Sequence, residues 1–283
     1  MSVTTFSFAD GVVNTQEILS YFQENGFVIL EEVLTSDEIK YYVDLFDQDR
    51  QKWGDLAVLW HPFGEYQTRN CHALVSSPEF DKLLRHENIL PITEFLMEGK
   101  TCFSELCLRH MTPYNGEPNQ SFHRDRPHWE EHPLRMDYLQ LMVYLSNVNQ
   151  ETHCFSISPE FVNISILDTA DQLDRNGIVD CHSVASTVIL FSNAVLHTAT
   201  VRVTKHERKT VQAYYGHRSR PFLSNCSITP PKFCYYHPDQ ETQDFYGNLN
   251  DTKECFCRLS SLNRMRAKSN LPPPKGKTHE DSF

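Results

Sequence analysis

The chain has 283 residues, of which 40% are hydrophobic and 12% aromatic, so it can bury a substantial core and fold as a globular protein. Its formal net charge of −11 argues against nucleic acid as a partner, because a phosphate backbone requires a basic face. The same charge disfavours anionic membrane surfaces. Composition therefore favours neither a nucleic-acid-binding nor a membrane-binding function.

The cysteines and the first residues predict a cytoplasmic protein. There are nine cysteines, an odd number, and the start MSVTTFSFADG has neither a basic nor an apolar leader segment. No apolar run reaches the roughly 20 residues that a membrane-spanning helix needs. The C-x-C pair Cys255 and Cys257 has no second pair at zinc spacing. We therefore expect reduced thiols and no structural zinc.

The N-terminal part of the chain predicts a helix–strand–helix scaffold. Residues 14–29 are typical of a helix that Asn14 or Thr15 caps and Gly26 ends, followed by a short strand at 27–30. A second helix is expected from Thr35 to about residue 51, with its apolar residues at helical spacing. Another helix-like run extends from residue 78 to 97.

From residue 100 the pattern changes to short apolar or alternating runs separated by turn residues. Strands are predicted at residues 101–111, 137–146, 154–157, 186–191 and 209–215, and a polar insertion or short helix at 167–177. There is no βαβ rhythm and no glycine-rich phosphate loop. This pattern predicts a mainly β protein, an antiparallel sandwich or jelly roll.

The C-terminal part turns polar beyond about residue 238. Residues 258–268 are expected to form a basic helix, and the proline- and lysine-rich stretch 269–283 a disordered tail. We therefore predict one domain over residues 1–268, with the jelly-roll core at about 100–220.

The candidate chemistry begins with His123 and Asp125 in the stretch NQSFHRDRPHW. On an extended segment, residues two apart point to the same side. A second histidine from elsewhere would complete the two-histidine, one-carboxylate set of non-haem Fe(II) oxygenases. His197 follows an apolar strand and lies 72 residues after Asp125, and Arg208 comes eleven residues later in the next predicted strand. We expect one hairpin to join His197 and Arg208, with both side chains pointing into one cavity. A buried arginine requires an anionic partner, such as the far carboxylate of a 2-oxo acid.

This order of residues resembles the phytanoyl-CoA dioxygenase family of Fe(II)/2-oxoglutarate oxygenases over roughly residues 15–220. The opening YFQENGFVILEEVLTSDEI is also similar to that family's N-terminal helix, turn and strand. The resemblance implies a double-stranded β-helix with flanking N-terminal helices and the cofactors Fe(II), 2-oxoglutarate and O2. It further implies that His123, Asp125 and His197 are the catalytic metal ligands and that Arg208 binds 2-oxoglutarate.

Within the family, the segment LRHMTPYNGEPNQSFHRD is most similar to the fungal branch that oxidises meroterpenoids and indole alkaloids. That similarity implies a co-substrate contact for Gln120, three residues before the first metal histidine, and for Arg69 in QTRNCHALVSSPEF. It also implies natural-product biosynthesis and a homodimer. Asp125 itself argues against halogenation, since halogenating relatives replace this carboxylate by a small residue. Hydroxylation, desaturation or rearrangement is then expected.

The chain departs from the family pattern at three places. A Gly-Ser-His stretch is missing at residues 159–161, where Pro159 stands before Glu160 and Phe161. Cys154 stands at or near a co-substrate-binding threonine, and Ala199 replaces a serine found in some relatives. Two alternatives to an oxygenase acting on a small, largely apolar metabolite therefore stay open. One is a jelly-roll binding or sensing protein without turnover, and the other is an enzyme that hydroxylates protein side chains.

Overall fold

The computed structural model describes residues 4–8, 14–125, 129–220, 224 and 226–247. Its strands are β1 (Thr5–Ser7), β2 (Phe27–Glu31), β3 (His61–Pro62), β4 (Gln67–Asn70), β5 (Thr101–Met111), β6 (Tyr138–Tyr144), β7 (Cys154–Ile157), β8 (Val179–Cys181), β9 (Val188–Ser192), β10 (His197–Thr200) and β11 (Arg208–His217). They form an eight-stranded sheet in the order β1-β2-β9-β6-β11-β5-β4-β3 and a three-stranded sheet in the order β10-β7-β8. The pairings are antiparallel, apart from that of β1 with β2.

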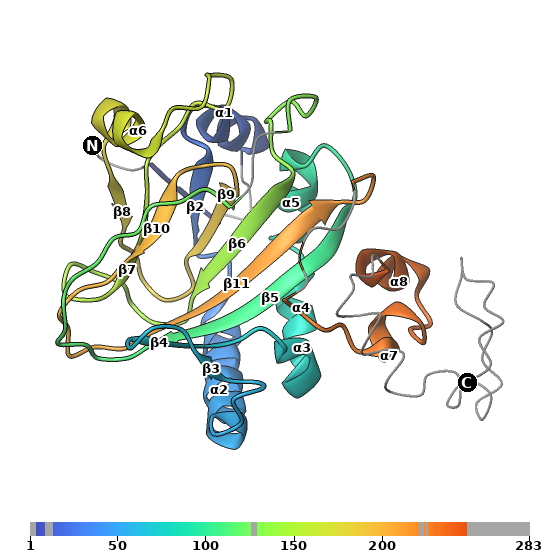
Figure 1. The fold of residues 1–283 in the computed structure, drawn as a ribbon. Helices are drawn as coiled ribbons and strands as arrows, with labels where there is room; N and C mark the ends of the chain where they lie inside the picture. Colours follow the sequence, from blue (N-terminus) through green and yellow to red (C-terminus); the bar gives the residue numbers. More distant parts are fainter. Residues whose placement is uncertain (1–3, 9–13, 126–128, 221–223, 225, 248–283) are drawn as a thin grey trace, which may run out of the picture.

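The two sheets form the jelly roll, or double-stranded β-helix, that the sequence predicts (Figure 1). The extended segment 114–125 lies beside β10 and adds an irregular fourth strand to the smaller sheet. Isolated bridges join Tyr114 to Thr204, Asn119 to Val201 and His123 to His197. The smaller sheet therefore carries the His-x-Asp segment at its edge, facing the larger sheet.

Helices flank the sheets. They are α1 (Thr15–Asn25), α2 (Ser36–Trp53), α3 (Ala73–Ser76), the 3-10 helix η1 (Pro78–Phe80), α4 (Asp81–Leu84), α5 (Leu90–Leu96), α6 (Thr169–Asn176), α7 (Pro231–Cys234) and α8 (Gln240–Tyr246). Among the described helices, none is long and apolar enough to cross a lipid bilayer.

The ends of the first two helices follow from local chemistry. The Asn14 side chain accepts a hydrogen bond from the Glu17 amide, and Thr35 forms a capping box with Glu38. Gly26 ends α1 with φ of 74°, and a Cβ there would lie 2.3 Å from Val195 Cγ2. Only glycine satisfies both the left-handed backbone and the close approach of the strand region before His197. The predicted scaffold is confirmed here.

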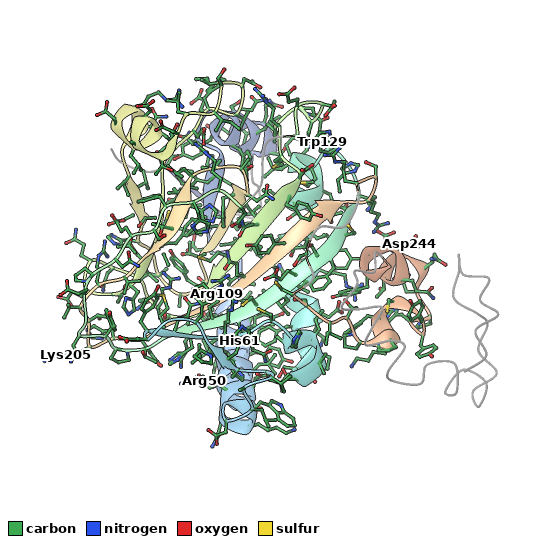
Figure 2. All side chains as sticks on the ribbon, viewed as in Figure 1. Arg50, His61, Arg109, Trp129, Lys205 and Asp244 are labelled. Carbon is green, nitrogen blue, oxygen red and sulfur yellow. The ribbon has the colours of Figure 1, made fainter. Side chains whose placement is uncertain are left out.

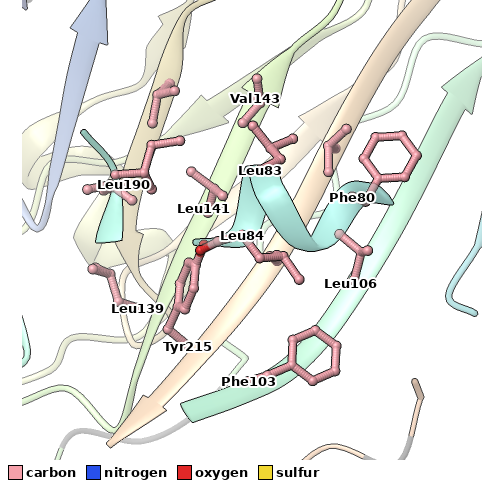
Figure 3. Close-up of a cluster of buried hydrophobic side chains, with 14 of the residues drawn as sticks. Phe80, Leu83, Leu84, Phe103, Leu106, Leu139, Leu141, Val143, Leu190 and Tyr215 are labelled. Carbon is pink, nitrogen blue, oxygen red and sulfur yellow. The ribbon is translucent and has the colours of Figure 1, made fainter. Parts of the chain in front are cut away.

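The outward face of the larger sheet carries the main hydrophobic core. Leu139, Leu141 and Val143 alternate along β6 toward the helices, and Leu83 and Leu84 of α4 lie over this part of the sheet (Figure 3). All of these side chains are fully buried. Side chains alternate along each strand, so the residues between these apolar ones point to the inward side of the sheet. Functional groups on these strands therefore lie on the inward side.

The inward faces of the two sheets enclose a second, smaller cluster at one end. It combines Phe27 and Ile29 of β2 with Phe191 of β9 and Phe155 of β7. The other end, along β6, β11, β5 and β4, carries polar and charged side chains in alternate positions. The interior is therefore divided into an apolar part and a polar part.

Two predictions from the sequence are wrong: a single helix over residues 78–97 and a hairpin that joins His197 to Arg208. The predicted helix at 78–97 is three short helical segments, because the Asn88 side chain donates to Val33 O and its amide donates to His86 Nδ1. β10 and β11 do not form a hairpin, because β10 pairs with β7 in the smaller sheet while β11 pairs with β5 and β6 in the larger. The chain crosses between the sheets after β10, so His197 and Arg208 approach the interior from opposite walls.

The region after β11 is less polar than the sequence predicts. Helix α8 buries Phe245 and Tyr246 against Phe103 of β5, and α7 packs beside it (Figure 1). The predicted basic helix at 258–268, the tail at 269–283 and the Cys255–Cys257 pair lie outside the described residues.

Candidate metal centre

His123, Asp125 and His197 come together where the edge segment meets β10. The backbones of His123 and His197 exchange two hydrogen bonds of 3.0 Å, which sets their side chains side by side. The Asp125 amide donates to Asn193 O at 3.0 Å. One nitrogen of each imidazole and a carboxylate oxygen of Asp125 all lie within 4.8 Å of one another. The geometry is that of three ligand atoms around one point.

The two imidazoles are oriented by their own backbones. His123 Nδ1 lies 2.9 Å from Ser121 O, and His197 Nδ1 lies 2.8 Å from Val195 O. Because a carbonyl can only accept, each Nδ1 carries a proton, which leaves Nε2 as the nitrogen that a metal ion would bind. These Nε2 atoms lie 3.4 Å and 3.7 Å from the Asp125 carboxylate oxygens. Each histidine therefore presents its metal-binding nitrogen to the common point.

Polar groups of the larger sheet fix the Asp125 carboxylate. Its Oδ2 accepts hydrogen bonds from Gln140 Nε2 at 2.6 Å and from the Tyr214 hydroxyl at 2.9 Å. Gln212 Nε2 in turn donates to Gln140 Oε1 at 2.8 Å. These supporting residues were not predicted from the sequence. The available signal was Gln140, a polar residue inside the otherwise apolar run of β6.

Burial and charge set the protonation states of the three groups. Burial lowers the pKa of His197 to about 4, so its ring is neutral at physiological pH. The hydrogen bond to Asp125 raises the pKa of His123. Burial alone would raise the pKa of Asp125, but the adjoining His123 and His197 imidazoles and the hydrogen bond from Tyr214 hold it well below its usual range. Asp125 is therefore a carboxylate at neutral pH.

Arg124, between the two edge ligands, anchors the segment on its other side. It pairs with the buried Glu160, and its Nη1 donates to Ala194 O at 2.8 Å. Glu160 stands in the stretch 159–161 where the family's Gly-Ser-His is missing. The departure from the family pattern thus supplies a buried ion pair that holds the His-x-Asp backbone beside β10.

Arg208, the first residue of β11, is buried on the inward face of the larger sheet with 2% of its surface exposed. Its Nε and Nη1 atoms are buried without a hydrogen-bond partner in the described residues. Burial lowers the pKa of its guanidinium, opposed by Tyr144 and Cys154 nearby. An unpaired buried guanidinium costs several kcal/mol, so this site requires an anion.

Gln120 and Arg69, the two other predicted co-substrate residues, both form hydrogen bonds with other side chains of the protein. Gln120 donates to Thr200 Oγ1 at 2.9 Å, and Thr200 lies an odd number of residues from His197 on β10, on its other face. Arg69 lies on β4 opposite Arg109 of β5, where its Nε hydrogen-bonds His61 at 2.7 Å and its guanidinium stacks on the Phe63 ring.

The remaining candidates do not join this cluster. Cys154 is buried and lies near Asp180 and His182, but Arg202 pairs with that aspartate and lies 3.3 Å from His182 Nε2, which opposes a cation there. Trp129 stacks on His132 and carries the Arg220 guanidinium over its ring. His128 lies outside the described residues.

The donor set fits Fe(II) and a 2-oxo acid. Two imidazoles and one carboxylate grouped together are the ligand set that non-haem iron oxygenases use. Arg208 on the facing wall, two of whose nitrogens have no hydrogen-bond partner among the described residues, fits the second carboxylate of a dicarboxylic acid.

Comparison with known proteins identifies the family of the chain. The model of the phytanoyl-CoA dioxygenase (PhyH) family matches residues 22–210, more than half of the chain. A search of curated protein sequences gives no match.

Solved structures share the fold at low sequence identity. EctD from S. alaskensis with bound Fe is 18% identical, with 77% of this chain and 82% of that chain covered and a TM-score of 0.62. The epimerase SnoN, in complex with Fe3+, alpha ketoglutarate and nogalamycin RO, is 17% identical over 74% and 86% of the chains, with a TM-score of 0.61. HygX from Streptomyces hygroscopicus, with nickel, 2-oxoglutarate and hygromycin B bound, is 18% identical over 71% and 87%, with a TM-score of 0.55.

Proposed function

Because the chain belongs to the phytanoyl-CoA dioxygenase (PhyH) family and is a non-haem Fe(II)/2-oxoglutarate-dependent dioxygenase, we propose that His123, Asp125 and His197 hold its iron. Arg208 binds the far carboxylate of 2-oxoglutarate. The prime substrate is a small, largely apolar metabolite, which the enzyme hydroxylates, desaturates or rearranges.

One observation carries the proposal. Three ligand atoms meet on the smaller sheet, and the larger sheet carries the buried Arg208 guanidinium, whose Nε and Nη1 have no hydrogen-bond partner in the described part of the chain. A purely structural arginine would be paired at this depth, because burying an unpaired charge destabilises the fold. The unpaired state of Arg208 supports a dedicated anionic co-substrate.

When bound, iron together with 2-oxoglutarate and O2 supplies the oxidising power. The chain's own residues position and protect the reaction. Ser121 O and Val195 O set the imidazole tautomers, while Gln140 and Tyr214 hold the carboxylate of Asp125 ionised. Arg208 orients the co-substrate, and Gln120 and Arg69 are proposed to assist it. With the Asp125 carboxylate in place, the reaction is an oxidation rather than a halogenation.

Two features support an apolar natural product as the substrate. The rings of Phe191 and Phe155 lie 5.1 Å and 5.7 Å from that of His197, so apolar surface adjoins the metal ligands. The structural neighbour SnoN holds nogalamycin RO, and the segment before His123 is similar to the fungal biosynthetic branch. A homodimer in the cytoplasm, expected from the same similarity and from the cysteines, completes the proposal.

The test is co-substrate turnover. Purified protein with Fe(II), 2-oxoglutarate and ascorbate should form succinate and CO2, at first without prime substrate and more rapidly with a matching metabolite. The His123→Ala variant is the control, and Arg208→Gln should raise the 2-oxoglutarate concentration needed for turnover. Iron binding without succinate above the His123→Ala level would instead favour a binding or sensing protein.

A further inference from the structure

The inward face of the larger sheet holds more unpartnered donors than 2-oxoglutarate needs. Besides Arg208, the described residues include three buried polar atoms without a hydrogen-bond partner on this face: Thr210 Oγ1, Arg109 Nε and Gln67 Nε2. They lie on adjacent strands, β11, β5 and β4. Each unpaired buried donor costs free energy, so the group as a whole points to a ligand.

Strand register places these side chains together. Arg109 is the Cα partner of Thr210 on one side and of Arg69 on the other. Met111, two residues further along β5, pairs with Arg208 and with Gln67. Paired residues on neighbouring strands share a face, and so do residues two apart on one strand. Arg208, Thr210, Arg109 and Gln67 therefore form one donor patch.

The same face links the donor patch to the metal centre. Tyr214, four residues after Thr210 on β11, donates to Asp125. Arg109 is the Cα partner of Thr210, so its side chain lies on the face that also carries Tyr214. In Figure 2 Arg109 lies at the centre of the molecule, among the strands of the larger sheet. The patch thus extends from the ligands to Arg208.

The charges in this interior do not balance. Glu105, the acidic residue on the same face of β5, accepts a hydrogen bond from Ser224 and forms no ion pair with Arg109 in the part of the chain described. Arg109 and Arg208 likewise form no ion pair with a carboxylate in the described residues. When 2-oxoglutarate is paired with Arg208, Arg109 still lacks a carboxylate partner there.

We propose that Arg109, assisted by Gln67, binds a carboxylate of the prime substrate, so that the enzyme oxidises an organic acid with an apolar body. The proposal rests on the function proposed above and defines its substrate class. A guanidinium grips a carboxylate through two parallel hydrogen bonds, and the Gln67 amide adds a third donor. The acid group would anchor the substrate at β5 and β4 while its apolar part extends toward Phe155 and Phe191.

The test uses a matched acid and amide. Wild-type protein is loaded anaerobically with Fe(II) and saturating 2-oxoglutarate, so that the Arg208 position is filled. Binding of 4-phenylbutyrate and of 4-phenylbutyramide is then measured by calorimetry. We expect the acid to bind at least about tenfold more tightly than the amide, the effect of one charge-assisted contact.

Two variants of Arg109 separate the outcomes. Arg109→Gln should abolish the preference for the acid, and Arg109→Lys, which keeps the charge, should retain part of it. Both should bind 2-oxoglutarate within about twofold of wild type, while Arg208→Gln should lose 2-oxoglutarate affinity. Thermal unfolding of each variant controls for misfolding.

Three results would overturn the proposal. The first is equal or undetectable binding of acid and amide to the loaded wild type. The second is a preference that survives in Arg109→Gln. The third is a tenfold loss of 2-oxoglutarate affinity in Arg109→Gln, which would assign Arg109 to the co-substrate instead. Failure of wild type to bind Fe(II) and 2-oxoglutarate at all would refute the proposed function itself, and is read in a separate titration.

Discussion

The two faces of the larger sheet are built on opposite rules. The outward face, seen in Figure 3, is filled by apolar side chains that the helices cover, with Leu141 and Val143 fully buried. The inward face of the same strands carries Gln140, Gln212 and Tyr214, which support the Asp125 carboxylate, and Arg208, which has no partner for two of its nitrogens.

The difference shows where stability and function are located. Residues one apart on β6 or β11 belong to different environments, because side chains alternate across a strand. The outward face stabilises the fold through burial of apolar area. The inward face retains polar and charged groups that the fold alone does not require. Substitutions on the two faces should therefore separate stability from ligand binding.

The largest effect on stability is expected on the outward face. Leu141→Ala removes a fully buried side chain from the main core and should lower the free energy of unfolding by about 2–5 kcal/mol. Thr210→Val, an inward substitution on the neighbouring strand whose hydroxyl has no partner, should change it by less than about 0.5 kcal/mol. Urea unfolding measures both, and equal losses would remove the distinction between the faces.

The second prediction concerns Arg208. Without ligand, Arg208→Leu should be at least as stable as wild type, since the substitution removes an unpaired buried charge. For wild type, 2-oxoglutarate at a hundred times its Kd should add about 2.7 kcal/mol, and for the variant this gain should disappear. Unfolding with and without 2-oxoglutarate tests this. If Arg208→Leu is less stable than wild type and is still stabilised by 2-oxoglutarate, Arg208 has a structural role instead.

The third prediction concerns the groups that hold Asp125. Tyr214→Phe and Gln140→Leu each remove one hydrogen bond to its Oδ2 and should weaken Fe(II) binding by about tenfold to a hundredfold. Competition with a chelator measures the affinity. Tyr215→Phe, which removes a hydroxyl from the outward face, where it donates to Leu84 O, is the matched control. Its iron affinity should remain that of wild type.

The smallest effect is expected at the start of α2, far from the site. Burial would raise the pKa of Glu38, but hydrogen bonds from Thr35 and His86 outweigh it and lower the pKa below the ordinary 4.5. A lowered pKa adds stability above pH 4.5 that is lost as pH falls through the folded-state pKa.

Glu38→Gln should therefore be less stable than wild type at pH 7, by about 0.5 kcal/mol. The difference should shrink as pH falls below 4.5. Unfolding curves at several pH values measure it. A difference that grows on acidification would contradict the sign.

The sequence predicted the parts of the site that local rules control. His123 and Asp125 could be placed on one side because period-two alternation is a property of a single strand. His197 and Arg208 were added to the predicted site from their order and spacing in the chain. Gln140, Tyr214 and Arg109 could not be found in this way, because their roles depend on which strands become neighbours. The hairpin was predicted wrongly for the same reason. The short sequence distance between His197 and Arg208 does not reveal that β10 and β11 belong to different sheets. The prediction of one helix over residues 78–97 was wrong because the Asn88 side chain donates to Val33 O and the Asn88 amide donates to His86 Nδ1, which interrupts the helix.

The central claim is that His123, Asp125 and His197 hold an iron ion that 2-oxoglutarate would chelate. Anaerobic titration of the protein with Fe(II) and 2-oxoglutarate tests it through the visible charge-transfer absorption of the chelate. The wild type should develop this absorption with one iron per chain, and Asp125→Ala and His197→Ala should not, while both remain folded. Absence of the absorption in the wild type, or equal absorption in the variants, would contradict the account.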